Sequence, residues 1–458
     1  MSAVIQTIPD EQDTRAALRF VTCGSVDDGK STLIGRLLVD SKTVLQDQLA
    51  GVQRGGQTDL ALLTDGLQAE REQGITIDVA YRYFNTAARK FIIADAPGHE
   101  QYTRNMVTAA SSSDAAVVLV DATKLDWQAA LPELLPQTRR HSLLVNLLRV
   151  PAVVFAVNKL DAVANPALAF ANISAALTQF AQHADIPVTA IVPVSALIGY
   201  NVVDPHPGWC NYNGPGLLQI LEELSATPAD THQPFAFPVQ WVEKPAPTLS
   251  TSLGTLPPEG AVSPKGGLSA ERFSSSSDTS QGRRIFWGRI ASGQAMPGQQ
   301  ITVMPSGKTA TIAQVLSHAR QPKNVAANHS AGVILDRELD VSRGDWLLAS
   351  EPSNPGTREI TATVAWMDEE PLVPGRMYWA LHGHRWVKAK IRRIVSHINI
   401  NTLKSHDAAQ LDANSIGVVE LSLLEPIAAL PYKQSRVLGS LILVDTASHK
   451  TSGAALVL

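Results

Sequence analysis

The sequence predicts an α/β domain built on a doubly wound, mostly parallel sheet, followed by two antiparallel β-barrel domains. Up to about residue 230, short apolar runs alternate with longer amphipathic stretches, a rhythm typical of parallel strands joined by crossover helices. After about residue 235, short segments of alternating polarity are separated by Gly, Pro and Asn turns, and a second such set begins near Arg358. The chain of 458 residues is also too long for one hydrophobic core.

The apolar runs of the first part are nearly continuous in Val, Ile and Ala, as in strands that are buried on both faces. They lie at 18–24, 91–95, 115–122, 152–161 and 189–197. Spacers with the length and pattern of helices lie at 31–39, 98–112 and 166–183. Together these segments predict the parallel sheet and the helices that cover it.

We expect three domains, at 16–232, 233–356 and 357–458, after a disordered N-terminus at 1–15. Residues 251–282 are rich in Ser, Gly and Pro and poor in bulky apolar side chains. Because strand-like sequence of the same character resumes after them, they predict a disordered insertion inside the second domain.

Charge and composition exclude several function classes. Hydrophobic residues make up 45% of the chain, and 38 Lys and Arg nearly balance 42 Asp and Glu, for a formal net charge of -4. This balance argues against non-specific nucleic-acid binding, which needs a basic face. No apolar stretch reaches the length of a membrane span, and the N-terminal segment lacks the layout of a secretory signal. We therefore expect a cytoplasmic protein with no nucleic-acid and no membrane partner.

Residues 24–32 read GSVDDGKST, the G-x4-G-K-[S/T] pattern of a phosphate-binding loop (P-loop) between a strand and a helix. Gly24 and Gly29 allow backbone angles that turn N–H groups toward phosphate oxygens, and the following helix adds its positive end. Lys30 can reach the β and γ phosphates, and the Ser31 hydroxyl is a hard-oxygen ligand for Mg²⁺. The phosphate-binding residues expected here are Gly24, Ser25, Val26, Asp27, Asp28, Gly29, Lys30, Ser31 and Thr32.

A second phosphate-facing segment, DAPGH at 95–99, follows another buried run. Asp95 is placed to approach Mg²⁺ through water, the Gly98 N–H to sense the γ-phosphate, and His99 to orient an attacking water. Asp-x-x-Gly alone is often only a turn, but its position one strand-helix-strand unit after the phosphate loop favours this role. The segment adds Asp95, Ala96, Pro97, Gly98 and His99 to the phosphate-binding set.

The motif NKLD at 158–161 predicts which base is bound, since it follows a buried strand where the crevice of an α/β sheet opens. Asp161 can accept hydrogen bonds from N1–H and the 2-amino group of guanine. Adenine has neither donor and would leave the carboxylate unpaired, at a cost of about 1–3 kcal/mol. Asn158 can tie this loop to the phosphate loop, the Lys159 stem can cover the base, and a backbone N–H of 195–197 can meet guanine O6. The expected guanine-binding residues are Asn158, Lys159, Leu160, Asp161, Ser195, Ala196 and Leu197.

Longer strings carry a resemblance to a known family. VDDGKST at 26–32, REQGITID at 71–78 and DAPGHEQYTRNM at 95–106 resemble the translational GTPase class typified by elongation factor Tu. Within that class the chain is most similar to the GTPase subunit of bacterial ATP sulfurylase. That subunit has Asp-Asp-Gly-Lys where elongation factors usually have Asp-His-Gly-Lys, and this chain has Asp-Asp-Gly-Lys at 27–30. The resemblance covers nearly the whole chain, so the first domain is expected to be a P-loop GTPase domain.

This resemblance implies a mechanism and a partner. Thr76 would complete the Mg²⁺ shell when GTP is bound, which makes 65–80 the first switch, and Gly98 with the helix after it would form the second. The implied catalytic residues are His99, Lys30, Thr76 and Gly98, and the implied ligands of the Mg²⁺ cofactor are Ser31, Thr76 and, through water, Asp95. Hydrolysis of the substrate GTP would drive a partner, the adenylyltransferase catalytic subunit. That partner makes adenosine 5′-phosphosulfate and pyrophosphate from ATP and sulfate, in a heterodimer or higher assembly.

The chain departs from the family pattern in two places. Ala96 replaces a common Thr, and residues 124–136 are longer than usual and predict an extra surface loop near the second switch. The chief alternative function is a translation-factor-like GTPase that delivers aminoacyl-tRNA, which the acidic net charge does not exclude. A nucleotide binder without catalysis is a third alternative, disfavoured by Thr76 and His99. Asp28 and the C-terminal sequence favour sulfate activation.

Overall fold

The computed structural model describes residues 15–42, 53–54, 57–58, 60, 76, 78–244, 283–317, 324–351 and 354–458. The predicted disordered segments at 1–15 and 251–282 lie outside this set, apart from Arg15, which begins the first strand. Most of the predicted first switch at 65–80 also lies outside it. Contacts divide the chain into two compact units: Met1–Pro228 with Val364–Val373 and Ile394–Val418, and Ala229–Thr363 with Pro374–Arg393 and Val419–Leu458. The division into three domains stays a prediction.

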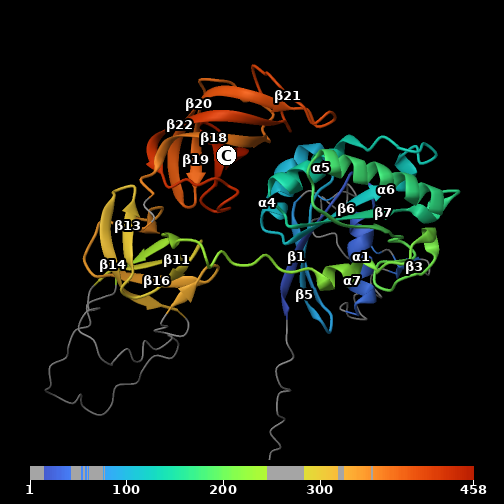
Figure 1. Cartoon of the computed structure of the whole chain (residues 1–458), viewed down its shortest axis with the longest axis horizontal. Helices are drawn as coiled ribbons and strands as arrows, with labels where there is room; N and C mark the ends of the chain where they lie inside the picture. The colour runs from blue at the N-terminus through green and yellow to red at the C-terminus, as the bar shows by residue number, and fades with distance from the viewer. Residues whose placement is uncertain are drawn as a thin grey trace, which may run out of the picture. The chain divides into compact units, whose positions relative to one another are not determined.

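The first unit contains a six-stranded sheet with the strand order β4-β5-β1-β6-β7-β8 (Figure 1). Five strands are parallel, and β4 lies antiparallel at one edge. The strands are β1 (Arg15–Cys23), β4 (Ala80–Asn85), β5 (Arg89–Asp95), β6 (Ala115–Asp121), β7 (Ala152–Asn158) and β8 (Val188–Pro193). β6 and β7 are buried along their whole length, as their continuous Val and Ala content predicts. The predicted mostly parallel sheet is confirmed.

Helices cover both faces of this sheet, so it is doubly wound as predicted. They are α1 (Lys30–Asp40), α4 (Thr103–Ser111), α5 (Pro136–Leu147), α6 (Pro166–His183) and α7 (Leu217–Glu223). α1 and α7 pack with one face in a single hydrophobic cluster. α4, α5 and α6 contact β1, β6 and β7. α6 begins where the sequence predicts, because the Asn165 side chain caps it by accepting from the Leu168 N–H and Pro166 takes the first helical position.

Three predicted boundaries in this unit need correction. β7 ends at Asn158 because Lys159 adopts a left-handed conformation (φ 61°) and Leu160–Ala162 forms a 3₁₀ turn. β8 ends at Pro193, short of the predicted residue 197. The helix predicted over 98–112 is a 3₁₀ turn, Glu100–Tyr102, followed by the shorter α4.

The Met1–Pro228 part of this unit also contains shorter elements. Two strands of two residues each, β2 (Gln53–Arg54) and β3 (Gln57–Thr58), pair antiparallel. Two more 3₁₀ turns, Ala122–Lys124 and Trp209–Asn211, follow β6 and precede α7.

The second large sheet is antiparallel and forms a β-barrel with the order β10-β11-β16-β14-β13-β17-β9. Its strands are β9 (Ala236–Pro238), β10 (Trp241–Glu243), β11 (Ile285–Arg289), β13 (Gln300–Met304), β14 (Lys308–Leu316), β16 (Ser330–Leu335) and β17 (Trp346–Ala349). β12 (Gln294–Ala295) and β15 (Val325–Ala326) form a separate small pair. Inward side chains such as Phe237, Ile301 and Val333 fill the interior. This is one of the two β-barrels predicted after residue 235.

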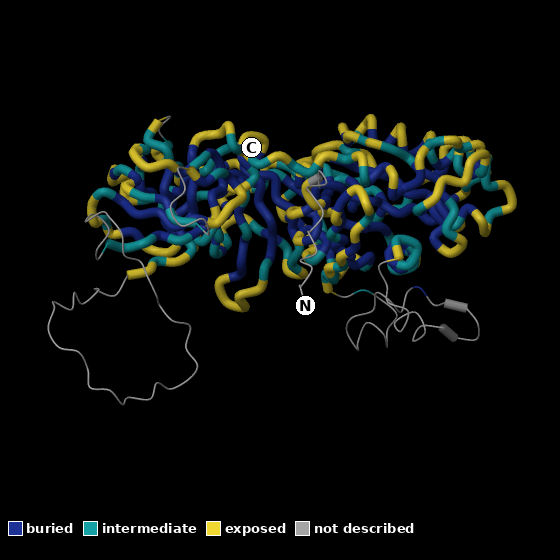
Figure 2. The backbone as a smooth tube through the Cα atoms, turned by 90° about the horizontal axis from the view of Figure 1, so that it is seen from below, coloured by how far each residue is buried: buried dark blue, intermediate teal, exposed yellow. Residues whose placement is uncertain are grey.

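The third large sheet has the order β19-β23-β24-β18-β22-β20-β21, and a further pairing of β19 with β20 closes it into the second predicted barrel. Its strands are β18 (Thr357–Trp366), β19 (Met377–His382), β20 (Arg385–Ile398), β21 (Ser405–His406), β22 (Ile416–Ile427), β23 (Ser440–Asp445) and β24 (Thr451–Val457). Along the described residues, Figure 2 shows buried stretches of backbone that alternate with exposed segments. No helix in the described part of the chain is long and apolar enough to cross a membrane.

A buried histidine on α5 gives the fold a pH dependence. His141 has no exposed surface, and neither ring nitrogen has a hydrogen-bond partner within the described residues. Burial, aided by the charges of Lys30 and Arg140, lowers the pKa of His141 from 6.5 to about 3. The unfolded chain therefore binds this proton more readily than the folded chain. The contribution of His141 to stability is complete above pH 6.5 and is lost as the pH falls toward 3.

We expect His141→Leu to reduce the acid sensitivity of unfolding, since leucine has no titrating group. One displaced proton changes the free energy of unfolding by about 1.4 kcal/mol per pH unit. Between pH 6.5 and pH 5, denaturant titrations should thus show the wild type losing about 2 kcal/mol more than the variant. The same loss in both proteins would mean that His141 is not held neutral in the fold.

Candidate nucleotide-binding site

The phosphate loop joins the end of β1 to the start of α1. Gly29 precedes the helix with a left-handed φ of 92°, and a Cβ at this position would lie 2.4 Å from Asn158 Nδ2. Glycine is therefore required at residue 29 by both conformation and space. The opening of α1 directs its first N–H groups toward the loop, which is the local geometry that binds anions.

Lys30 lies between this loop and the Asp-x-x-Gly segment. Its side chain is buried, and Nζ donates hydrogen bonds to the carbonyl oxygens of Ser25 (2.7 Å) and Gly24 (3.3 Å). A Cβ at Gly98 would lie 2.9 Å from the backbone carbonyl of Ser25, so only glycine allows the two segments to approach this closely. Burial lowers the pKa of Lys30, while Asp28 and Asp95 oppose this shift. The ammonium group is thus held where both phosphate-facing segments meet.

Asp95 occupies the carboxyl end of β5, beside Thr22 of the neighbouring strand. Its Oδ1 accepts a hydrogen bond from Thr22 Oγ1 (3.3 Å), and the carboxylate is buried. Ser31, in the first turn of α1, is half-buried, as is Thr76. Two hydroxyls and a carboxylate are hard-oxygen donors of the kind that Mg²⁺ prefers, so these residue types fit that ion. The structure describes Thr76 without most of its neighbours and gives no ligand distance for it.

His99 lies directly before the 3₁₀ turn Glu100–Tyr102. Its ring packs edge-on against Tyr102, with 6.2 Å between centroids, and its Nε2 is buried without a hydrogen-bond partner among the described residues. α5 holds this segment from outside: Gln137 Nε2 donates to the Gly98 carbonyl (3.4 Å), and Arg140 pairs with Glu100. A buried polar atom without a partner calls for an explanation, and a water held beside the γ-phosphate would provide one.

One buried amide joins three of the four motifs. Asn158, the last residue of β7, donates from Nδ2 to the Asp28 carbonyl (2.8 Å). Its Oδ1 accepts the Ala196 N–H (3.0 Å). Lys159 Nζ donates to the Asp27 carbonyl (2.5 Å). The phosphate loop, the NKLD loop and the Ser195-Ala196-Leu197 segment therefore form one connected site.

In the NKLD loop and the 195–197 segment, some side chains are buried and others are accessible to a ligand. Leu160 is fully buried, whereas Asp161 in the same 3₁₀ turn is exposed. Ser195 is buried, and its Oγ accepts the Ile198 N–H (3.2 Å). Leu197 is exposed. The Asp161 carboxylate is thus accessible at the crevice where the sequence predicts the base.

Sequence reasoning did not find three residues that position these loops. Arg36 of α1 donates from Nε to the Ala196 carbonyl (3.2 Å) and from Nη2 to the Leu197 carbonyl. Lys124 pairs with Asp28 (3.0 Å), and Asp121 pairs with Lys159 (2.8 Å). Asp121 had a usable signal, because it ends the buried strand between the two motif-bearing strands. Arg36 and Lys124 look like ordinary surface cations in the sequence.

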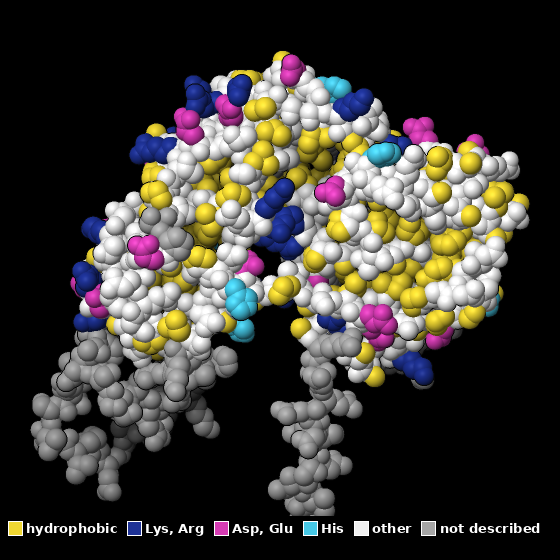
Figure 3. Space-filling model, in the orientation of Figure 1, with side chains coloured by type: hydrophobic (Ala, Val, Ile, Leu, Met, Phe, Trp, Pro, Cys, Tyr) yellow, Lys and Arg dark blue, Asp and Glu magenta, His cyan; other side chains and the backbone are white. Residues whose placement is uncertain are grey.

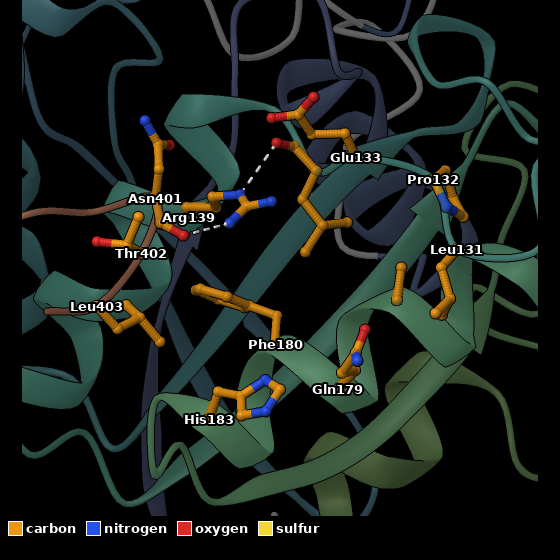
Figure 4. Close-up of a pocket in the computed structure, with 12 residues that line it drawn as sticks. Leu131, Pro132, Glu133, Arg139, Gln179, Phe180, His183, Asn401, Thr402 and Leu403 are labelled. Carbon is orange, nitrogen blue, oxygen red and sulfur yellow. Dashed lines mark hydrogen bonds between the residues drawn. The ribbon is translucent and has the colours of Figure 1, made fainter.

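A separate cavity of about 630 Å³ is lined by residues of α5 and α6, of 131–134 and of 401–403 (Figure 4). Arg139 crosses it, donating to the carbonyl oxygens of Leu134 (3.2 Å) and Asn401 (3.0 Å), with its guanidinium 5.7 Å from the Phe180 ring centroid. Leu131–Leu134 of the predicted extra loop form one wall. None of the predicted nucleotide-binding residues lines this cavity. It is therefore distinct from the candidate nucleotide site.

Two family models match the chain. The elongation factor Tu GTP binding domain matches residues 15–229, and the GTP-eEF1A C-terminal domain-like family matches residues 359–458. The chain is 40% identical over 454 residues to sulfate adenylyltransferase subunit 1 of Laribacter hongkongensis, covering 97% of this chain and 86% of that protein. The chain belongs to the sulfate adenylyltransferase subunit 1 family. Its Salmonella typhi relative is 41% identical over 456 residues, with 97% and 86% covered, and the Alteromonas mediterranea relative is 39% identical over 457 residues, with 98% and 88% covered.

Membership of the sulfate adenylyltransferase subunit 1 family confirms the resemblance predicted from the motifs at 26–32, 71–78 and 95–106. The GTP binding domain match spans all four motifs, from the phosphate loop to Ser195-Ala196-Leu197. The individual roles of the site residues stay predictions.

Proposed function

We propose that this member of the sulfate adenylyltransferase subunit 1 family binds and hydrolyses GTP. We further propose that hydrolysis drives a partner subunit to make adenosine 5′-phosphosulfate from ATP and sulfate. The observation that carries the nucleotide assignment is the Asn158 amide, which joins Asp28 of the phosphate loop to Ala196 of the base loop. These two hydrogen bonds fix the spacing between the phosphate loop and the base-binding loop. The exposed Asp161 carboxylate then reads guanine by accepting its N1–H and 2-amino group.

Each phosphate-facing residue has one task in this proposal. Lys30, held between the two phosphate segments, neutralises charge on the β and γ phosphates. Ser31, Thr76 and, through water, Asp95 would hold Mg²⁺, which neutralises charge that develops on the phosphates. His99 orients the attacking water through its ring nitrogen, and the Gly98 N–H detects whether the γ-phosphate is present. These roles rest on the motif positions together with the burial and contacts of the described side chains.

Loss of the γ-phosphate would release the contacts of Thr76 and Gly98, and the two switches would then change conformation. The name subunit 1 in the relatives supports a second, catalytic subunit as the receiver of this change. We propose that the two chains form a heterodimer or a higher assembly. The cytoplasmic location stays a prediction.

The rival function, delivery of aminoacyl-tRNA by a translation-factor-like GTPase, uses the same architecture. On the face drawn in Figure 3, most Lys and Arg side chains lie among Asp and Glu, and one small group of basic side chains lies near the centre of the view. Identity of about 40% over nearly the whole chain to proteins named sulfate adenylyltransferase subunit 1 favours sulfate activation. We therefore treat delivery of aminoacyl-tRNA as the alternative that the following experiment tests.

GTP turnover by the purified chain separates the two functions. We expect the rate to rise about tenfold or more when the adenylyltransferase subunit, ATP and sulfate are added together, because a partner that completes the site acts on the transition state. Ribosomes with aminoacyl-tRNA serve as the matched alternative stimulus. Stimulation by ribosomes and none by the adenylyltransferase mixture would overturn the sulfate assignment and leave the GTP site intact.

A further inference from the structure

The phosphate loop contains a buried carboxylate that phosphate binding alone does not explain. Asp28 has no exposed surface, although it lies in a loop that receives polyphosphate. Its Oδ2 accepts the Ser25 N–H at 2.5 Å, which closes the turn of the loop on itself. Burial raises the pKa of the Asp28 carboxyl, and the charge of Lys124 is the largest opposing cause. An ionised carboxylate here would repel an incoming anion unless a cation neutralised it.

That cation comes from outside the four nucleotide motifs. Lys124 lies on the 3₁₀ turn Ala122–Lys124 after β6, and its Nζ is 3.0 Å from Asp28 Oδ1. The same ammonium group also donates to the Val26 carbonyl. Lys124 therefore contacts the phosphate loop at two points, the side chain of Asp28 and the backbone carbonyl of Val26.

The contact belongs to a chain of four alternating charges, Asp28–Lys124–Asp121–Lys159. Lys124 Nζ is 3.8 Å from Asp121 Oδ2, and the same oxygen forms an ion pair with Lys159 Nζ at 2.8 Å. Asp121 is fully buried and is fixed by the N–H and hydroxyl of Thr123. Because Lys159 in turn donates to the Asp27 carbonyl, the two lysines hold consecutive carbonyl groups of the loop.

We propose that Lys124 is a positioning residue for GTP and GDP, which keeps the phosphate loop in its anion-cradling shape by neutralising and orienting the buried Asp28 carboxylate. This inference rests on the proposed GTP site. It explains the second Asp of the Asp-Asp pair in the loop. Asp28 closes the turn by accepting the Ser25 N–H, and Lys124 neutralises the Asp28 charge so that a polyphosphate can bind nearby. A cradle formed before nucleotide arrives loses less conformational freedom on binding.

Nucleotide affinity of charge variants tests the proposal. We expect Lys124→Met to raise the Kd for GDP and GTP about 10- to 100-fold, chiefly through faster release, because the buried Asp28 carboxylate loses the cation that neutralises it. The KM for GTP should rise in proportion, while kcat at saturating GTP stays close to that of the wild type. Lys124→Arg should retain most of the affinity. Lys90→Met, an exposed lysine on β5, is the control for loss of one positive charge.

A double variant separates positioning of Asp28 from a general effect of charge. Asp28→Asn combined with Lys124→Met leaves a neutral pair, and we expect it to bind GDP more tightly than Lys124→Met alone. Affinity of Lys124→Met equal to that of Lys90→Met, or a double variant with no recovery, would overturn the proposal. If Lys124→Met does not fold, the GDP affinities of Lys124→Arg and of the double variant are compared with that of the wild type. Wild-type affinity in Lys124→Arg and in the double variant is the expected result, and a large loss of affinity in Lys124→Arg would overturn the proposal. Wild-type protein that binds no GTP would instead overturn the proposed function.

Discussion

Replacing Asp161 by asparagine should exchange guanine for xanthine as the preferred base. The carboxylate accepts two guanine N–H donors in the proposed complex, and an amide presents a donor where the 2-amino group would approach. Xanthine has an oxygen at that position, so it accepts from the amide. We expect GTP affinity to fall about 10- to 100-fold and xanthosine triphosphate to become the better ligand.

Equilibrium titration with labelled GDP and xanthosine diphosphate measures this exchange directly. Asp204→Asn is a suitable control, because Asp204 is an exposed carboxylate of the same unit outside the four motifs. Its affinity for both nucleotides should match the wild type. Unchanged GTP affinity in Asp161→Asn would remove Asp161 from the base site, although the phosphate loop would stand unaffected.

Replacing His99 by alanine should separate GTP binding from GTP hydrolysis. His99 precedes the second switch helix, and its Nε2 is buried without a partner in the described structure. A residue that orients the attacking water contributes to the transition state and little to ground-state binding. We expect the hydrolysis rate to fall about 10²- to 10⁴-fold, with GTP affinity kept within a few fold.

Single-turnover hydrolysis at saturating GTP reads this rate without interference from product release. His183→Ala provides the matched control, since His183 is an exposed histidine at the end of α6, beside the separate cavity. A His99→Ala protein that hydrolyses GTP at the wild-type rate would show that another group orients the water. Loss of binding and hydrolysis together would assign His99 a structural role.

The sequence revealed most of the parallel sheet because its strands are buried on both faces. β6 and β7 consist mostly of Val and Ala and are buried at every residue, so they appear in the sequence as uninterrupted apolar runs. β4 was not predicted because it is an edge strand without a continuous apolar run. In it, exposed Tyr81 and Tyr83 alternate with half-buried residues. β24 was missed for a different reason: its small residues, TSGAALV, have weak intrinsic strand preference, and pairing with β23 stabilises it.

Candidate site residues can be recognised in the sequence where a short motif fixes a backbone shape. Gly29 is needed for its left-handed φ and its contact with Asn158, and Gly98 because a Cβ there would collide with the Ser25 backbone, so their motifs are short and recognisable. The hydrogen bond from Asn158 to the phosphate loop was predicted and is present. Arg36 and Lys124 could not be found in this way, because they act through contacts between segments about 100 or more residues apart, as Arg36 with Ala196. Only the fold brings such side chains together.

We propose that GTP hydrolysis in this chain drives sulfate adenylylation by its partner. The most direct test measures adenosine 5′-phosphosulfate formed from ATP and sulfate by the two subunits together, with GTP or with a non-hydrolysable GTP analogue. We expect more product with GTP than with the analogue, a matching amount of GTP hydrolysed, and loss of this gain in His99→Ala. Equal product with GTP and with the analogue would contradict this proposal.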